Sequence, residues 1–161
     1  MPRKALMEME DPDRTPPGAE LAFDGLDGLL GYRLRRAQGA MHRHYMICVA
    51  ELDLTQTQTA ALWLINGNPG VSQVDLASTL GMDRATMMAI IDRVEARALV
   101  LRRKSATDRR RQELNLTPAG QSLLRKVKAR IALHESHFKL HFTRPELGAL
   151  LTALQKFQDV S

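Results

Sequence analysis

Three consecutive arginines, Arg109–Arg111, lie between two stretches in which apolar and polar residues alternate. Like charges at this spacing repel one another, so the run requires either an anionic partner or full exposure to water. Arginine suits phosphate groups because its planar guanidinium donates several hydrogen bonds in a fixed geometry. The segment SATDRRRQELNLTPAG, residues 105–120, therefore indicates either phosphate binding or a solvated loop.

Positive charge is concentrated around this segment. Residues 97–130 hold eleven basic and two acidic residues, whereas residues 1–20 carry a net charge of −2 and the whole chain +5. Such a basic cluster is typical of surfaces that meet nucleic acid, phosphate or an anionic surface. The charge alone does not separate these partners from a merely solvated basic face.

Histidine and cysteine offer a second kind of chemistry. His134, His137 and His141 are spaced at i, i+3 and i+7, and histidines four residues apart on a helix can chelate a metal. No cysteine or carboxylate cluster lies beside them in the sequence, so we predict no metal site. The single cysteine, Cys48, excludes an internal disulfide and fits a reducing cytoplasm. It falls on an apolar stripe, where burial makes a thiol unreactive.

Motifs of the common enzyme classes are absent. The sequence has no nucleophile elbow, no glycine-rich phosphate loop and no H-E-x-x-H motif. The run His134-Glu135-Ser136-His137 has the wrong spacing for a zinc protease. We therefore predict a protein that is not an enzyme and needs no cofactor.

Helical periodicity dominates the rest of the chain. Apolar residues recur every three or four positions from Leu26 to Leu52, which predicts one helix of 27 residues. Such a helix is about 40 Å long, and we expect part of it to pack on another subunit. Thr55 and Gln58 form a capping-box signal that starts a second helix.

A tight turn joins the next two predicted helices. Ser72 is placed to cap the first, Gly81 interrupts the chain, and Asp83 caps the second. Two short helices joined in this way form a helix-turn-helix. Residues 99–104 and 112–117 then alternate as two strands, with the arginine run at the tip between them.

Two further helices complete the predicted fold. Thr117 precedes Pro118 at the start of one, and Thr143 with Glu146 forms a capping box at the start of the other. The fold class is mainly α: a winged helix-turn-helix with a two-stranded β-wing, flanked by long N- and C-terminal helices.

The chain divides into predicted parts of different character. We expect a disordered N-terminal tail over residues 1–20, long terminal helices over 21–54 and 118–161, and the winged helix-turn-helix over 55–117. No apolar run approaches the roughly 20 residues that cross a bilayer, and the N-terminus lacks a signal-peptide pattern.

These motifs resemble the MarR family of transcriptional regulators over residues 25–158. The stretch ATDRRRQELNLTPAG, residues 106–120, resembles the D-x-R wing of the family followed by L-x-L-T-x-x-G. The stretch LGMDRATMMAIIDRVEARALVLR, residues 80–102, resembles its recognition helix and first wing strand. The resemblance implies an obligate homodimer with dimerisation helices over 21–54 and 118–161 and a DNA-binding domain over 55–117. It also implies a short palindromic DNA site and release by a small ligand.

The outer face of the predicted recognition helix presents its first turns to base edges. Arg84 can bind a guanine or a phosphate, whereas Met88 and Ala89 can contact thymine methyl groups. Many relatives carry an arginine at the position of Ala89, which shifts the expected base reading toward Arg84 and the wing. By resemblance, Arg110 enters the minor groove and Asp108 holds it in a charge-assisted pair.

The predicted DNA contacts extend along both elements. They are Ser72, Arg84, Ala85, Thr86, Met88, Ala89, Arg93, Arg103, Lys104, Asp108, Arg109, Arg110 and Arg111. Arg102 is expected to contact phosphate or to be solvated. Asp92 and Arg93 either contact the DNA backbone or brace the wing through ion pairs, and we favour bracing.

The effector pocket of the family lies between the dimer helices and the DNA-binding lobe. The candidate residues there are Arg36, Met41, His44, Tyr45, Cys48, Trp63 and His134, although each also fits the core or the dimer interface. Three effector classes compete: an aromatic or other carboxylate or its coenzyme A thioester, a metal at the histidines, and oxidation of Cys48. Family precedent favours the first class.

The sequence therefore predicts a cytoplasmic, homodimeric, sequence-specific repressor that binds a near-palindromic operator and is released by a small ligand. An architectural DNA-binding protein without an effector is the alternative, and it would discriminate weakly between DNA sequences. A metal- or redox-responsive regulator of the same fold is a second alternative.

Overall fold

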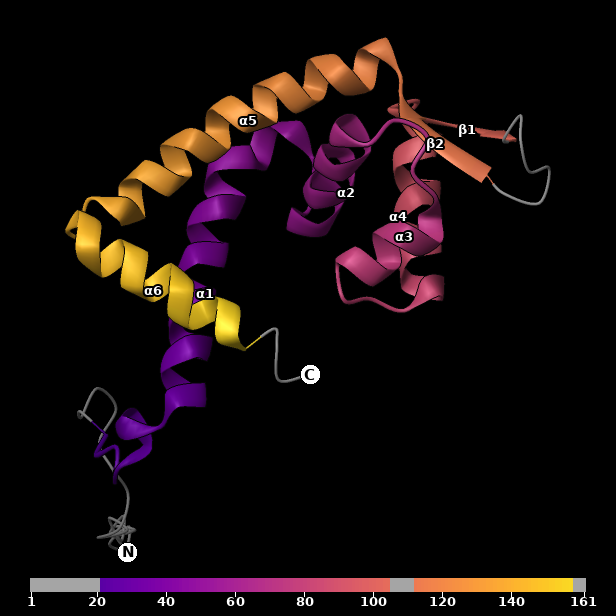
Figure 1. Cartoon of the computed structure of the whole chain (residues 1–161). Coiled ribbons are helices and arrows are strands. Elements are labelled where there is room, and N and C mark those ends of the chain that lie inside the picture. The colour runs from indigo at the N-terminus through magenta and orange to yellow at the C-terminus, as the bar shows by residue number, and fades with distance from the viewer. Residues whose placement is uncertain (1–20, 105–111, 158–161) are drawn as a thin grey trace, which may run out of the picture. The chain divides into compact units, whose positions relative to one another are not determined.

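The structure is a computed structural model in which residues 21–104 and 112–157 are described (Figure 1). It divides into two units, residues 1–37 and 38–161, which we describe separately. Its elements are η1 (Leu26–Gly28), α1 (Leu30–Val49), η2 (Ala50–Leu52), α2 (Gln56–Gly67), α3 (Gln73–Thr79), α4 (Arg84–Ala96), β1 (Val100–Lys104), β2 (Gln112–Leu116), α5 (Pro118–Lys139) and α6 (Arg144–Lys156).

The predicted helix over residues 26–52 is wrong at both ends. The 3-10 turn η1 precedes Leu29, which is extended at φ −76° and ψ 128°, so α1 begins only at Leu30. Gly25, at φ 83°, precedes this turn and Gly28 is its last residue, and glycine disfavours a continuous helix. At the other end α1 gives way to η2, and Asp53 leaves the helix at φ 48°.

The first unit contributes the start of α1 and the turn before it. Arg33 forms an ion pair with Asp27 at 3.6 Å. The Tyr32 ring packs edge-on against Phe23 with 6.0 Å between ring centroids, and the Tyr32 hydroxyl accepts a 2.9 Å hydrogen bond from Arg36. These contacts are local and exposed.

Side-chain caps start the helices of the second unit where the sequence predicts them. Thr55 and Thr143 each form a complete capping box, with Gln58 and Glu146 respectively. Ser72 caps α3, Asp83 caps α4 and Thr117 caps α5. Each cap satisfies backbone N–H groups that have no partner within the helix.

The core of the second unit lies where α2, α4, α5 and the two strands meet. It contains large side chains that are at most 1% exposed, among them Leu62, Ile65, Met87, Ile91, Leu114 and Val127. They come from one face of each helix, as the spacing of apolar residues predicts. This core fixes how α4 and the strands are presented.

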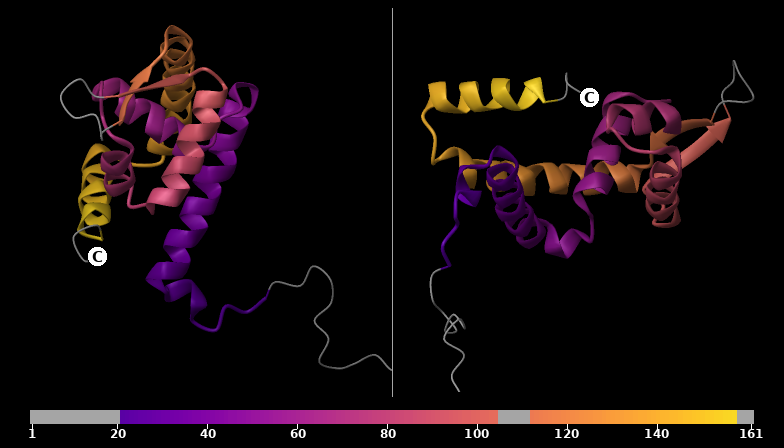
Figure 2. Two further views of the ribbon diagram at one scale, coloured as in Figure 1. Left: turned by 90° about the vertical axis from the view of Figure 1, so that its right-hand side faces the viewer. Right: turned by 90° about the horizontal axis from the view of Figure 1, so that it is seen from below.

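The two strands form an antiparallel hairpin that extends beyond α3 and α4 (Figure 2). Val100 pairs with Leu116, and Lys104 pairs with Gln112. The junction with α5 is tight, because a Cβ atom added to Gly120 would lie 2.0 Å from the carbonyl oxygen of Leu99. The predicted arginine-rich tip falls in residues 105–111, outside the described residues.

The last helix, α6, leaves its apolar stripe uncovered in the single chain. Leu151 is 57% exposed, and Leu150, Leu154 and Phe157 are also exposed. Among the described residues, no helix combines the length and apolar character needed to cross a membrane.

Candidate DNA-binding face and histidine cluster

The N-terminus of α4 is held by two hydrogen bonds that Thr86 donates to Asp83. The Asp83 carboxylate accepts a 2.8 Å hydrogen bond from the backbone N–H of Thr86 and a 2.6 Å bond from its hydroxyl. These hydrogen bonds hold the pKa of the Asp83 carboxyl below its ordinary value. The predicted DNA contact Thr86 therefore has its hydroxyl engaged in the cap.

The first turns of α4 separate a buried face from an exposed one. Met87 and Ile91 are fully buried, whereas Met88 is 52% exposed and Arg84 is also exposed. Ala85 and Ala89 share the exposed face, so the outer residues that the sequence assigns to DNA do stand outside the core.

The base of the wing is braced by an arginine. The Arg102 guanidinium donates to the Asp92 carboxylate and lies 2.8 Å from a Glu95 carboxylate oxygen, and only 22% of its side chain is exposed. Arg102 is therefore not the solvated side chain that was one of its two expected states, because α4 supplies its anionic partners. The expected bracing role of Asp92 is confirmed.

The remaining predicted DNA contacts are distributed over three elements. Arg103 and Lys104 are exposed on β1. The Ser72 hydroxyl caps α3 and donates a 2.7 Å bond to Asp75. Arg93 lies with Arg97 in a pocket of about 500 Å³ beside the end of α1. Asp108, Arg109, Arg110 and Arg111 lie outside the described residues.

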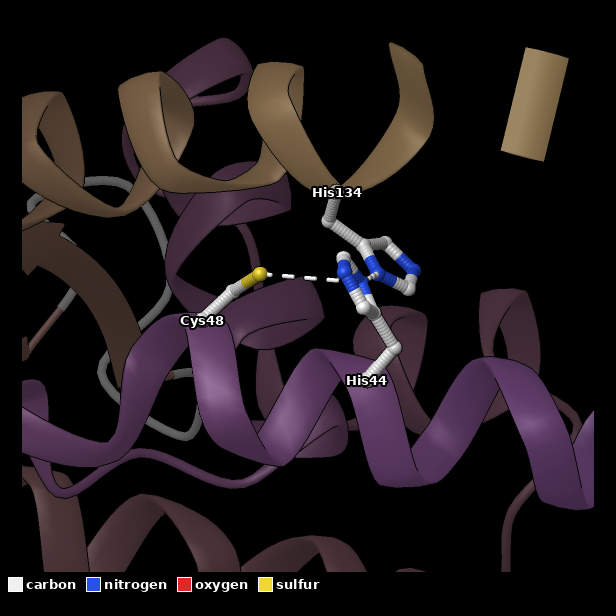
Figure 3. Close-up of side chains that lie close together, drawn as sticks. All are labelled: His44, Cys48 and His134. Carbon is white, nitrogen blue, oxygen red and sulfur yellow. Dashed lines mark hydrogen bonds between the residues drawn. The ribbon is translucent and has the colours of Figure 1, made fainter. Parts of the chain in front are cut away.

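A cluster of His44, Cys48 and His134 joins α1 to α5 (Figure 3). The Nδ1 atoms of His44 and His134 are 2.8 Å apart, and the Cys48 sulfur lies 3.6 Å from Nδ1 of His44. The potential ligand atoms of all three residues lie within 4.8 Å of one another. The expectation that no cysteine lies beside the histidines is wrong, because α1 crosses α5 at this point and brings Cys48 close to His134.

Aromatic rings surround the cluster. The His134 ring is 4% exposed and packs edge-on against Phe138 and Tyr45, with centroid distances of 5.3 and 5.9 Å. Burial, followed by the nearby His44, lowers the pKa of His134, which favours the neutral form of its imidazole. The exposed His137 ring stacks on His44 at 4.2 Å. His141 lies beyond the end of α5.

The other predicted effector residues do not gather at one place. The Tyr45 hydroxyl is 2.7 Å from the Thr59 hydroxyl, close to the histidine cluster. Trp63 lines an apolar pocket of about 370 Å³, and the Lys128 amine lies 4.5 Å from the centroid of its ring. Met41 is exposed, and Arg36 belongs to the first unit.

Comparison with known proteins identifies the group to which this chain belongs. The sequence profile of the MarR family matches residues 52–111. A regulatory protein for the hcr operon of Thauera aromatica is 31% identical over 139 residues, which are 86% of this chain and 84% of that protein. The chain belongs to the MarR family. It is a transcriptional regulator of the MarR type.

Solved structures of MarR-type repressors share the fold. CouR bound to a 23-mer DNA duplex is 37% identical, with a TM-score of 0.83 and coverage of 87% of this chain and 99% of CouR. CouR bound to p-coumaroyl-CoA is 36% identical, with a TM-score of 0.79 and coverage of 86% and 98%. PcaV of Streptomyces coelicolor with its natural ligand is 25% identical, with a TM-score of 0.74 and coverage of 88% and 97%.

Two partnerships in this MarR-type chain were not predicted: that of Asp92 and Glu95 with Arg102, and that of His44 with His134. The double ion pair of Arg102 joins residues that are ten and seven positions apart, and the spacing of Asp92 and Glu95 on one helix face was the available signal. The contact of His44 with His134 spans 90 positions, and no local pattern reveals which residues two crossing helices bring together.

Proposed function

We propose that this MarR-family chain is a cytoplasmic homodimeric repressor without catalytic activity. It binds a near-palindromic operator and is released by an aromatic carboxylate or its coenzyme A thioester. The exposed face of α4 carries this proposal, because Arg84, Ala85, Met88 and Ala89 stand outside the core on the second helix of a helix-turn-helix. Such a helix places its N-terminal residues in the major groove.

The DNA contacts divide by chemistry. Arg84 is the candidate for a bidentate bond to guanine, and Met88 is the candidate for contact with thymine methyl groups. Arg103 and Lys104 on β1 face solvent and fit phosphate contacts. Arg110, held by Asp108, is the candidate for the minor groove, in the segment that contains the arginine run. CouR, which this chain matches along nearly its whole length, is a repressor seen on a DNA duplex.

Dimerisation is proposed through residues 21–54 and 118–161, with residues 55–117 as the DNA-binding domain. The support is apolar surface that the single chain leaves exposed: Leu151 on α6 is 57% exposed, and Leu133 on α5 is 62% exposed. Apolar surface of this kind is typical of protein interfaces. Two DNA-binding domains related by a two-fold axis would bind the two half-sites of a palindromic operator.

The proposed effector is aromatic because of the Trp63 pocket and the relatives. Thr59, Leu64 and Ile131 line this pocket beside Trp63, and such a lining accepts an aromatic acyl group. The Lys128 amine above the indole ring offers a positive charge to a carboxylate or phosphate. CouR binds p-coumaroyl-CoA, which combines an aromatic acyl group with anionic phosphates.

A release experiment tests this proposal. Purified protein is bound to the labelled DNA upstream of its own gene and titrated with p-coumaroyl-CoA, p-coumarate or coenzyme A, with anisotropy as the readout. We expect one of the first two to release the DNA and coenzyme A alone to leave it bound. Trp63 is the only tryptophan, so quenching of its fluorescence reports arrival of the ligand directly.

Two variants define the pocket. Trp63→Leu should raise the ligand concentration needed for release by about tenfold or more, because it removes the aromatic partner. Trp63→Phe should retain most of the response, since it keeps a ring, and both variants should bind DNA like the parent. If neither aromatic compound releases DNA or quenches the fluorescence at millimolar concentration, the proposed effector class is wrong.

A further inference from the structure

We propose that His44, Cys48 and His134 form a Zn²⁺ site that links α1 to α5. This site is distinct from the proposed aromatic effector and does not depend on it. The three residues come from two helices that are far apart in the sequence, and their ligand atoms converge within 4.8 Å of one another. Figure 3 shows the side chains pointing toward a shared point between the helices.

The distances are close to those that zinc requires. Zinc bonds of about 2.0 Å to nitrogen and about 2.3 Å to sulfur place neighbouring ligands of a tetrahedron about 3.3 Å apart for two nitrogens and about 3.6 Å apart for nitrogen and sulfur. The Cys48 sulfur already lies 3.6 Å from Nδ1 of His44. The Nδ1 atoms of His44 and His134, at 2.8 Å, need to separate by only about 0.5 Å.

The donor set selects the class of metal. One thiolate and two imidazoles suit zinc, whereas calcium and magnesium require oxygen ligands. The aromatic rings of Tyr45 and Phe138 against His134 exclude water from one side, which strengthens metal–ligand bonds. A fourth position is left for water or another ligand, as in zinc sites with three protein ligands.

Binding has two consequences for the chain. Because the thiolate is the ligand, Cys48 releases its proton to the solvent when zinc binds. Because the unfolded chain cannot assemble three ligands that are up to 90 residues apart, zinc stabilises the folded state and ties α1 to α5. Both effects are measurable without DNA or an organic ligand.

The test uses the full-length protein, stripped of metal and kept reduced with a phosphine. Co²⁺, which is a spectroscopic substitute for Zn²⁺, is titrated first, and Zn²⁺ is then used to displace it. We expect one Co²⁺ per chain, a sulfur-to-cobalt charge-transfer band in the near ultraviolet, and a melting temperature that rises with Zn²⁺ concentration.

Variants locate the metal. Cys48→Ser should abolish the charge-transfer band and weaken binding by at least about 100-fold, since loss of even an outer partner costs 10- to 100-fold. His44→Gln should weaken binding similarly and provides a second test if one variant folds poorly. His42→Gln is the matched control, because His42 lies on the same helix, bonds Gln56 at 3.0 Å and should not affect the metal.

Three results would each overturn the proposal. One is the absence of stoichiometric Co²⁺ or Zn²⁺ binding by folded protein. Another is a site that persists unchanged in Cys48→Ser. A third is binding that is lost in His141→Gln instead, which would place the metal on the exposed His137 and His141.

Discussion

The exposed face of α4 and the histidine cluster place polar side chains in opposite surroundings. On α4, Arg84 projects into water from a helix whose opposite face, with Met87 and Ile91, is fully buried. In the cluster, His134 is 4% exposed and its nitrogen is paired with that of His44. A charged side chain that meets DNA must keep its charge, whereas a metal-ligating histidine must be neutral. Burial is therefore the property that separates the two uses.

The largest expected effect is a loss of stability on substitution of Gly120, at the tight junction between the strands and α5. Gly120→Ala should lower the free energy of unfolding by about 3 kcal/mol, because the added Cβ would lie 2.0 Å from the Leu99 carbonyl oxygen. Urea unfolding measures this change. Gly148→Ala on α6 is the control, since nothing lies within 4 Å of the added atom, and it should not destabilise the chain. Equal effects of the two substitutions would show that the junction is not tight.

The next largest effect concerns DNA affinity. Arg110→Ala should weaken operator binding by about 10- to 100-fold, as expected for loss of one arginine that enters a groove. Fluorescence anisotropy measures the affinity. Arg144→Ala removes the same charge from the first turn of α6 and should change affinity little. If both variants lose affinity equally, the wing has no special role.

Two of the three basic residues of β1 provide a finer test of burial as the distinguishing property. Lys104→Gln should reduce the slope of log affinity against log salt by about one, because an exposed lysine contacts phosphate. Arg102→Gln should weaken binding while leaving this slope nearly unchanged, because its guanidinium is held by Asp92 and Glu95. A slope that changes equally in both variants would contradict the assigned bracing role.

The smallest expected effect is the dependence of the free energy of unfolding on pH. His134 in the histidine cluster and Asp83 on α4 contribute to it in different pH ranges. Burial and His44 lower the pKa of His134, so the unfolded chain binds its proton more readily than the folded chain. Stability should therefore fall as the pH drops below about 6.5. The lowered pKa of Asp83 acts only in a more acidic range, where protonation removes its hydrogen bonds to Thr86.

Urea midpoints from about pH 7.5 to about pH 5.5 measure the His134 contribution. They are recorded on metal-free protein, because metal binding competes with protonation. His134→Gln should flatten the dependence across this range. A parent protein whose stability rises as the pH falls would contradict the assignment.

Local signals predict much of the fold because they act within a few residues. The caps at Ser72, Asp83 and Thr117 and the alternation of the strands specify where elements begin, and the structure confirms them. The predicted single helix over residues 26–52 is wrong, since a periodic apolar pattern continues across turns that break the backbone.

The candidate sites also differ in whether local sequence signals or tertiary packing determine them. The exposed face of α4 follows from helical spacing alone, so Arg84 and Met88 could be placed from the sequence. The meeting of Cys48 with His134 depends on how α1 crosses α5, and tertiary packing determines that crossing. The partners of Arg102 likewise require the hairpin to lie against α4.

The most direct test of sequence-specific DNA binding compares two DNA duplexes. Affinity of the unmodified protein is measured for the DNA upstream of its own gene and for a shuffled duplex of the same composition, over a salt series. A sequence-specific repressor should prefer its own upstream DNA by at least about 10³-fold at physiological salt, with both affinities falling as salt rises. Equal affinity for the two duplexes at every salt concentration would contradict sequence-specific reading by α4 and the wing.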